Sequence, residues 1–83
     1  LDSAVQDEGT SPLEAAIAQD TMDRYDAALQ RLKPEEREAV ISRVEFDLSY
    51  AELAEVLGKP SPNAARMAVV RALLRLAEEM GPA

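Results

Sequence analysis

Four basic side chains and no acidic one lie within residues 58–77, in a chain whose formal net charge is −7. This segment is locally +4, and screening over about 10 Å at 0.1 M salt separates it from most acidic groups elsewhere in the chain. Clustered guanidinium and ammonium groups predict the binding of an anion, such as the phosphate of a nucleic acid. The four basic residues are Lys59, Arg66, Arg71 and Arg75.

Catalytic and metal chemistry have little support in the composition. The chain contains no cysteine and no histidine, so it lacks thiolate ligands, disulfides, the commonest metal ligand and the commonest general base. Glu35, Glu36 and Glu38 cluster, but they follow Pro34 at a predicted helix start, where carboxylates stabilise the helix dipole. We therefore expect no enzyme, no cofactor and no metal site.

The acidic charge is concentrated at the start of the chain. Residues 1–23 hold six acids and no base, whereas residues 24–83 hold nine bases and ten acids. Residues 1–10 have the composition of a linker or tail, which leaves one domain over residues 11–83. The chain begins at Leu1 rather than methionine, which predicts a fragment or a processed product. With no signal peptide and no apolar run of about 20 residues, we expect a cytoplasmic protein and no membrane partner.

Residues 48–68 have the pattern of two short helices joined by a tight turn. Ser49 and Glu52 form a capping box that starts the first helix. Gly58 supplies the left-handed residue that ends it, and the Ser61-Pro62 pair supplies a cap and an N1 proline for the next helix. This is the helix-turn-helix pattern, whose second helix lies in the major groove of DNA.

The remaining segments also predict helices, and no alternating run predicts a strand. The fold class is therefore all-α: a four-helix domain with a C-terminal helix-turn-helix. The predicted helices span about residues 12–32, 34–46, 50–57 and 62–80.

Helical spacing assigns a core face to each long helix. In the first helix, Leu13 and Ile17 lie off this face, which predicts either a bend near residues 19–23 or a second packing surface. The predicted core residues are Met22, Tyr25, Leu29 and Leu32 in the first helix, Arg37 (by its stem), Val40, Ile41 and Val44 in the second, and Ala65, Val69, Ala72, Leu73, Leu76 and Met80 in the last.

Val70 and Leu74 lie outside the core face of the last helix and predict an exposed apolar patch. We expect this patch either to mediate self-association or to be covered by the half of the first helix that carries Leu13 and Ile17.

Three segments of the chain resemble region 4 of bacterial RNA polymerase sigma factors, most closely the extracytoplasmic-function group. ALQRLKPEEREAV is similar to the family's A-L-x-x-L-P-x-x-x-R-E-V, and FDLSYAELAEVLG to its x-G-L-S-Y-x-E-I-A-x-x-L-G. AARMAVVRALLRL matches T-V-K-S-R-L-S-R-A-R-x-x-L loosely. Asp47 stands where glycine is common, and KPSPNA, one residue longer, replaces the usual glycine-threonine at the head of the recognition helix.

The resemblance implies recognition of the promoter −35 element, docking on the β-subunit flap of RNA polymerase and sequestration by an anti-sigma factor. It also implies that residues 1–10 correspond to the linker from region 2. By position, Arg71 matches the family's recognition-helix arginine and Arg66 its lysine. Met67, Ala68 and Val70 occupy positions where the family is usually polar or basic.

Each candidate interface residue also has a structural interpretation. The arginines fit the solvated face of an amphipathic helix, Ser61 and Asn63 fit capping and turn positions, and Tyr50 fits a cover for the core. The candidate DNA-binding residues are Tyr50, Lys59, Ser61, Asn63, Arg66, Met67, Val70, Arg71 and Arg75.

An alternative function is a protein-interaction module with little DNA affinity of its own. In that hypothesis an apolar surface binds an anti-sigma factor, the polymerase or a second copy of the chain. Its residues are Leu13, Ile17, Met67, Val70 and Leu74.

Overall fold

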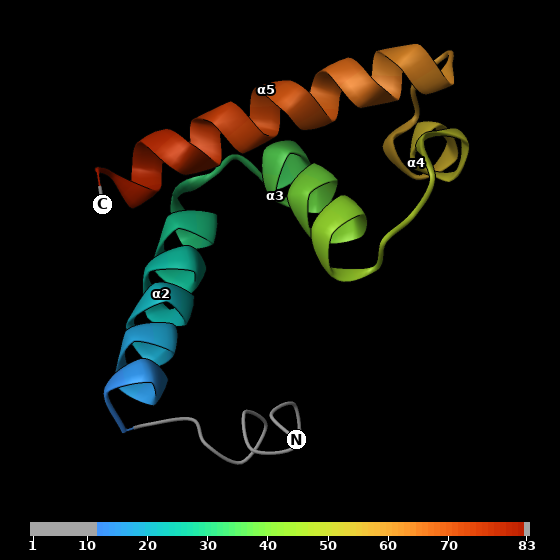
Figure 1. The fold of residues 1–83 in the computed structure, drawn as a ribbon. Coiled ribbons are helices and arrows are strands. Elements are labelled where there is room, and N and C mark those ends of the chain that lie inside the picture. The colour runs from blue at the N-terminus through green and yellow to red at the C-terminus, as the bar shows by residue number, and fades with distance from the viewer. Residues whose placement is uncertain (1–11, 83) are drawn as a thin grey trace, which may run out of the picture.

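A computed structural model describes residues 12–82, and within that range all regular elements are helices. The predicted all-α fold with a C-terminal helix-turn-helix is confirmed. The acidic residues 1–10 and Ser11 lie outside the described residues. The elements are α2 (Pro12–Arg31), α3 (Pro34–Val40), the π-helix η1 (Ile41–Glu45), α4 (Tyr50–Leu57) and α5 (Pro62–Met80) (Figure 1).

Helix α5 is the element against which the others pack. It runs across one side of the molecule, and α2, α3 and α4 each contact it (Figure 1). Its buried residues are Ala65, Val69, Ala72 and Leu76, all on the predicted core face.

The prediction for Leu73 was wrong, because this side chain is exposed. At 100° per residue Leu73 lies about 70° from the centre of the core face, at its edge, where the surface of α5 faces solvent. Met80, at the last turn, is half-buried and packs against the core as predicted.

The core is small and rich in alanine. Small side chains let helices approach closely, so each alanine brings two backbones together rather than filling space between them. Every described buried side-chain nitrogen or oxygen atom has a hydrogen-bond partner. The buried hydrophobic residues are Ala28, Leu29, Leu32, Ala39, Val40, Leu53, Ala54, Ala65, Val69, Ala72 and Leu76.

Two arginines close the corners of the fold by capping helix C-termini. Arg37 Nε donates to the carbonyl of Leu29 at 3.0 Å and its Nη2 to that of Leu32 at 3.4 Å, at the end of α2. Arg24 Nη2 donates to the Met80 carbonyl at the end of α5, at 2.8 Å. These guanidinium groups satisfy carbonyls that a helix leaves unpaired and offset the negative end of its dipole.

The second predicted helix changes type halfway. After Val40 the chain forms η1, and the Phe46 N–H donates to the Ile41 carbonyl, five residues back, at 3.2 Å. The wider turn rotates the following side chains relative to an α-helix. Val44, predicted in the core, is therefore 52% exposed, while Ser42 is buried.

The helix-turn-helix forms through the predicted caps. Ser49 Oγ accepts from the Glu52 N–H at 3.1 Å, and the Glu52 carboxylate accepts from the Ser49 N–H at 2.8 Å. Gly58 has a φ of 67° and ends α4 in the left-handed conformation. Ser61 Oγ then accepts from the Ala64 N–H at 3.1 Å and starts α5.

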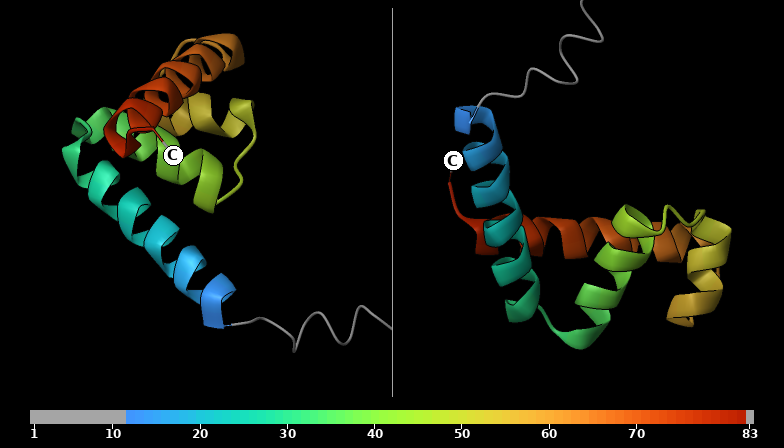
Figure 2. Two further views of the ribbon diagram at one scale, coloured as in Figure 1. Left: turned by 60° about the vertical axis from the view of Figure 1, so that its left-hand side comes forward. Right: turned by 90° about the horizontal axis from the view of Figure 1, so that it is seen from below.

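The N-terminal half of α2 extends away from the other helices (Figures 1 and 2). Helix α2 is continuous and runs straight through residues 19–23, so of the two alternatives the bend is not seen (Figures 1 and 2). Leu13, Ile17 and Met22 are exposed; for Met22 this contradicts the predicted core position. This half of α2 does not cover Leu74, which is 62% exposed, so the expectation that it covers the apolar patch is wrong.

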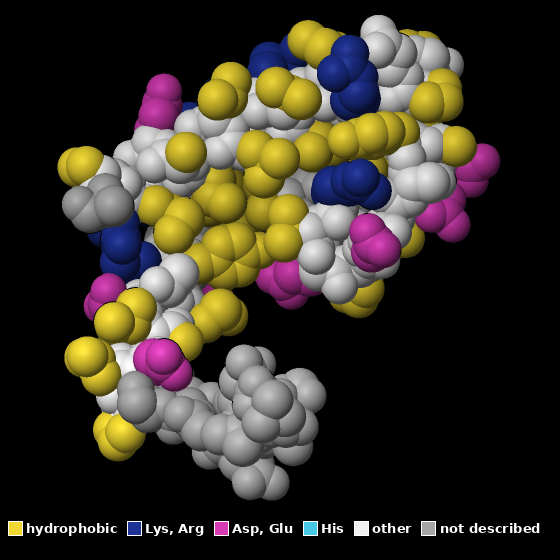
Figure 3. Space-filling view, in the orientation of Figure 1, with side chains coloured by type: hydrophobic (Ala, Val, Ile, Leu, Met, Phe, Trp, Pro, Cys, Tyr) yellow, Lys and Arg dark blue, Asp and Glu magenta, His cyan; other side chains and the backbone are white. Residues whose placement is uncertain are grey.

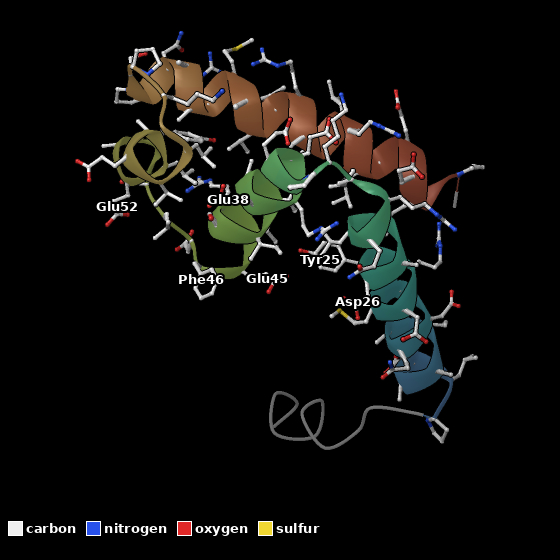
Figure 4. The ribbon with its side chains drawn as sticks, turned by 180° about the vertical axis from the view of Figure 1, so that it is seen from behind. Tyr25, Asp26, Glu38, Glu45, Phe46 and Glu52 are labelled. Carbon is white, nitrogen blue, oxygen red and sulfur yellow. The ribbon has the colours of Figure 1, made fainter. Side chains whose placement is uncertain are left out.

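One polar contact joins α2 to η1. The Tyr25 hydroxyl donates to the Glu45 carboxylate at 3.0 Å, and the two side chains point toward each other (Figure 4). Burial raises the pKa of Tyr25 to about 12; the hydrogen bond to Glu45 and the charges of Glu45 and Asp26 add to this.

The pKa of Tyr25 predicts a pH dependence of stability. Because the folded-state value of about 12 exceeds the ordinary 10.0, the stabilisation is fully present below pH 10.0 and is lost as the pH rises through about 12. The phenolate absorbance assigned to Tyr25, by difference from Tyr25→Phe, should titrate with a midpoint near 12. Glu45→Gln should lower that midpoint, and a midpoint near 10 in the wild type would contradict the contact.

The left-handed backbone conformation of Asp47 predicts that two substitutions there differ in their effect on stability. Its φ of 54° lies in the left-handed region, which is unfavourable for residues with a Cβ by about 1–2 kcal/mol and less so for Asp. Asp47→Ala should destabilise the domain by about 1 kcal/mol, whereas Asp47→Gly should stay within about 0.5 kcal/mol of wild type. Both changes remove the exposed ion pair with Arg43, so urea unfolding compares the backbone effect alone. Equal stabilities of the two variants would contradict it.

Candidate nucleic-acid interface

The structure brings two of the predicted cations together beside one cleft. Lys59 follows the turn after α4, with its N–H donating to the Ala54 carbonyl at 2.7 Å, and Arg71 lies two turns into α5. Both line a cleft of about 260 Å³. Its other lining residues are Lys33, Glu35, Glu36, Glu38, Ala39, Leu57, Ala68 and Ala72.

The opposite wall of this cleft is acidic. Glu35, Glu36 and Glu38 come from α3, while Lys59 and Arg71 come from the helix-turn-helix. Glu36 is partly engaged, because its carboxylate accepts from the Lys33 N–H at 2.9 Å. Sequence reasoning assigned these acids only to the dipole of α3. Their position near Arg71 depends on how α3 packs against α5, and no local pattern reports that packing.

A second group of candidate residues lies in the first turn and a half of α5. Arg66 Nη2 donates to Asn63 Oδ1 at 3.1 Å, and both side chains are exposed. Ser61 is half-buried and its oxygen is used as the cap of α5. The first turn of α5 contains no acid, so the positive end of the helix dipole and Arg66 present positive potential at this end.

Arg75 differs from the other cations because it is paired inside its own helix. Its Nη1 forms a close ion pair with Glu79 and a second one with Glu78 at 3.5 Å. Glu79 also lies 4.0 Å from Arg31 Nε on α2. Arg75 is therefore part of the junction between α2 and α5, and its charge is largely offset by neighbouring carboxylates.

The outward face of α5 is apolar along its centre. We name as the apolar ridge the residues spaced alternately three and four positions apart on this face: Met67, Val70, Leu74 and Ala77. All four are exposed. Hydrophobic and basic side chains lie next to one another along the N-terminal half of α5 (Figure 3). The helix that the sequence assigns to DNA thus presents an apolar centre with cations on its flanks.

Tyr50 lies apart from these groups. It is the first residue of α4, about 12 Å along the helix axis from the Gly58–Lys59 turn. Its half-buried ring lies 4.6 Å from the Arg43 guanidinium carbon, whose Nη1 donates to the Leu48 carbonyl at 2.7 Å. Tyr50 therefore packs at the corner between η1 and α4.

Over residues 12–82 no group of three or more acidic side chains is arranged to hold a metal ion. None of the helices in this part of the chain is both long enough and apolar enough to cross a membrane.

Comparison with known families identifies the fold. The family described as "Sigma-70, region 4" matches residues 22–76, which include all of α3, η1 and α4 and most of α5. The chain therefore belongs to the sigma-70 region 4 family, whose domains bind the −35 element of promoters and RNA polymerase. Neither the curated proteins nor the solved structures gave a match.

The acidic wall of the cleft predicts that neutralising it strengthens DNA binding. Each carboxylate removed should lower the repulsion of a phosphate by roughly 0.5 kcal/mol at about 8 Å in water. Glu35→Gln with Glu38→Gln should therefore raise the affinity for duplex DNA about fivefold, measured by fluorescence anisotropy at low salt. Asp20→Asn with Asp26→Asn removes the same charge from α2 and serves as the control. Equal effects of the two double variants would show that only net charge matters.

Proposed function

We propose that this domain recognises the promoter −35 element as the C-terminal DNA-binding domain of an alternative sigma factor of the extracytoplasmic-function type. In this role it acts in the cytoplasm, docks on the β-subunit flap of RNA polymerase and is sequestered by an anti-sigma factor. The observation that carries the proposal is the capped turn that presents the acid-free N-terminal half of α5, with Lys59, Arg66 and Arg71 exposed.

The geometry divides the interface residues by task. In a helix-turn-helix the N-terminal part of the second helix meets base edges, and here that part carries Asn63 and Arg66. Lys59 and Arg71, on the flank, are placed to contact phosphate. Met67 and Val70 offer apolar contact, which suits the methyl group of thymine better than a hydrogen-bonding base edge.

The small number of free cations sets the strength of the interaction. With Arg75 paired to Glu78 and Glu79, three of the four basic residues within residues 58–77 remain for phosphate. Three phosphate contacts give a salt dependence of log affinity with a slope of about −3. We therefore propose that the isolated domain binds DNA weakly and that docking on the polymerase supplies the remaining affinity by raising its effective concentration.

A second candidate function is a protein-interaction module with little DNA affinity. The apolar ridge favours it, because Leu74 lies on the face of α5 that would face DNA and has no polar group to offer. Binding partners in this hypothesis are an anti-sigma factor, the polymerase or a second copy of the chain.

Arg71→Ala provides the direct test of the DNA-binding function. Arg71 is exposed, so the free energy of unfolding should change by no more than about 0.5 kcal/mol. If Arg71 contacts a phosphate, the slope of log affinity against log salt should become less steep by about 1 on every sequence. If it contacts guanine, the loss should be about 1–3 kcal/mol on the preferred site only.

The measurement is a salt titration of binding to a promoter duplex and to a scrambled duplex. Arg75→Ala is the matched control: it removes an arginine one turn further along α5 that is already paired, and it should change affinity less than Arg71→Ala does. Equal affinities and equal slopes for wild type and Arg71→Ala would contradict the DNA-facing position of α5 and favour the protein-interaction function.

A further inference from the structure

Two exposed apolar surfaces on different helices have opposite charge. The apolar ridge of α5 is flanked by Arg66 and Arg71, and residues 58–77 contain no acid. The second surface is the segment of α2 over residues 12–23, which contains three acids and no base and which we name the acidic segment. Leu13 and Ile17, the two large apolar side chains on one face of this segment, are 70% and 58% exposed, while Met22 lies on the other side of the helix.

The two surfaces cannot meet within one molecule as it is folded. Helix α2 joins the body through its C-terminal half, where Ala28 and Leu29 are buried and Arg24 is bonded to the end of α5. The acidic segment extends away from that junction (Figures 1 and 2). By helical spacing the ridge lies on the side of α5 opposite its buried face. Each surface is thus available to a second molecule.

We propose that the acidic segment of one molecule docks on the apolar ridge of a second copy of this chain. The lengths agree, because the eleven residues from Leu13 to Asp23 and the eleven from Met67 to Ala77 each span about 15 Å of helix. Leu13 and Ile17, four residues apart, present one face that fits against the three-four spacing of Val70 and Leu74. Asp20 continues this face one turn further.

Charge fixes the relative direction of the two helices. Asp20 and Asp23 lie at the C-terminal end of the acidic segment, and Arg66 and Arg71 lie toward the N-terminal end of the ridge. The carboxylates approach these arginines only when the two helices run antiparallel, which also opposes their dipoles favourably. Leu13 then lies at the other end of the ridge, over a hollow lined by Leu74, Ala77, Glu78, Gly81 and Pro82.

The proposed contact is head-to-tail, because it uses different surfaces on the two copies. The dimer keeps one free acidic segment on one copy and one free ridge on the other, so association continues beyond the dimer as concentration rises. One pair of short helices also buries less than the area of a stable interface, so the association is weak and reversible. The proposal does not depend on DNA binding.

The test uses two variants of the full chain, each with one surface disabled. Leu13→Ser with Ile17→Ser removes the apolar side chains of the acidic segment, and Val70→Ser with Leu74→Ser removes those of the ridge. All four side chains are exposed, so both variants should keep the helical circular dichroism of the wild type. Phe46→Ser is the matched control, because it removes an exposed apolar side chain that belongs to neither surface.

Sedimentation equilibrium from micromolar to millimolar concentration, without DNA, gives the readout. The wild type and Phe46→Ser should increase in average mass with concentration, and each double variant alone should stay at 9.0 kDa, the mass of one chain. An equimolar mixture of the two variants should form a dimer and stop there, because each partner retains one intact surface.

Three results would overturn the proposal. They are a wild type that stays monomeric over the whole range, a mixture of the two variants that stays monomeric, and association that survives the loss of Leu13 and Ile17. The last would show that the ridge pairs with itself or with another surface. Since no DNA is present, none of these results bears on promoter recognition, which the Arg71→Ala titration tests separately.

Discussion

The packing of α2, α3 and α4 against one face of α5 is the constraint on which the rest of the structure depends. Ala65, Val69, Ala72 and Leu76 form that face, and α2, α3 and α4 each pack against α5, whereas η1 packs against α3. With no disulfide and a core rich in alanine, the domain has few other sources of stability. Because the same helix presents its outer face to a partner, changes on its inner face should alter binding as well as folding.

Most of the arginines in this chain serve the fold rather than the interface. Arg24 and Arg37 cap helix ends, Arg43 closes the corner before α4, and Arg75 pairs with carboxylates of its own helix. A count of positive charge along the sequence therefore overstates what a nucleic acid would meet. The exposed cations of the helix-turn-helix are Lys59, Arg66 and Arg71, and acids from α3 line the same cleft as Lys59 and Arg71. This arrangement predicts a modest affinity for DNA.

The apolar centre of the outward face of α5 gives this family member a dual character. A helix that carries cations on its flanks and aliphatic side chains along its centre suits both a DNA groove and a complementary helix. Occupation of the ridge by a protein would exclude DNA from the same face. Binding of DNA and binding of a protein at this surface are therefore expected to compete rather than to add.

The sequence by itself determined the helices and their ends, because caps, prolines and Gly58 act within a few residues and need no distant partner. It also identified the family and the exposed position of Leu74. It did not determine that η1 turns Val44 outward, that Arg75 is paired with Glu79, or that Glu35 and Glu38 face Arg71 and Lys59. The placement of Glu35 and Glu38 beside Arg71 and Lys59 depends on which surfaces of distant helices meet. The exposure of Val44 depends on how the wider turn of η1 packs. The pairing of Arg75 depends on which rotamers the α2–α5 junction allows. The four-residue spacing of Arg75 and Glu79 is visible in the sequence. Only the tertiary structure decides how α3 packs against α5 and which residues line the cleft, because residues that are far apart in the sequence must first be brought together.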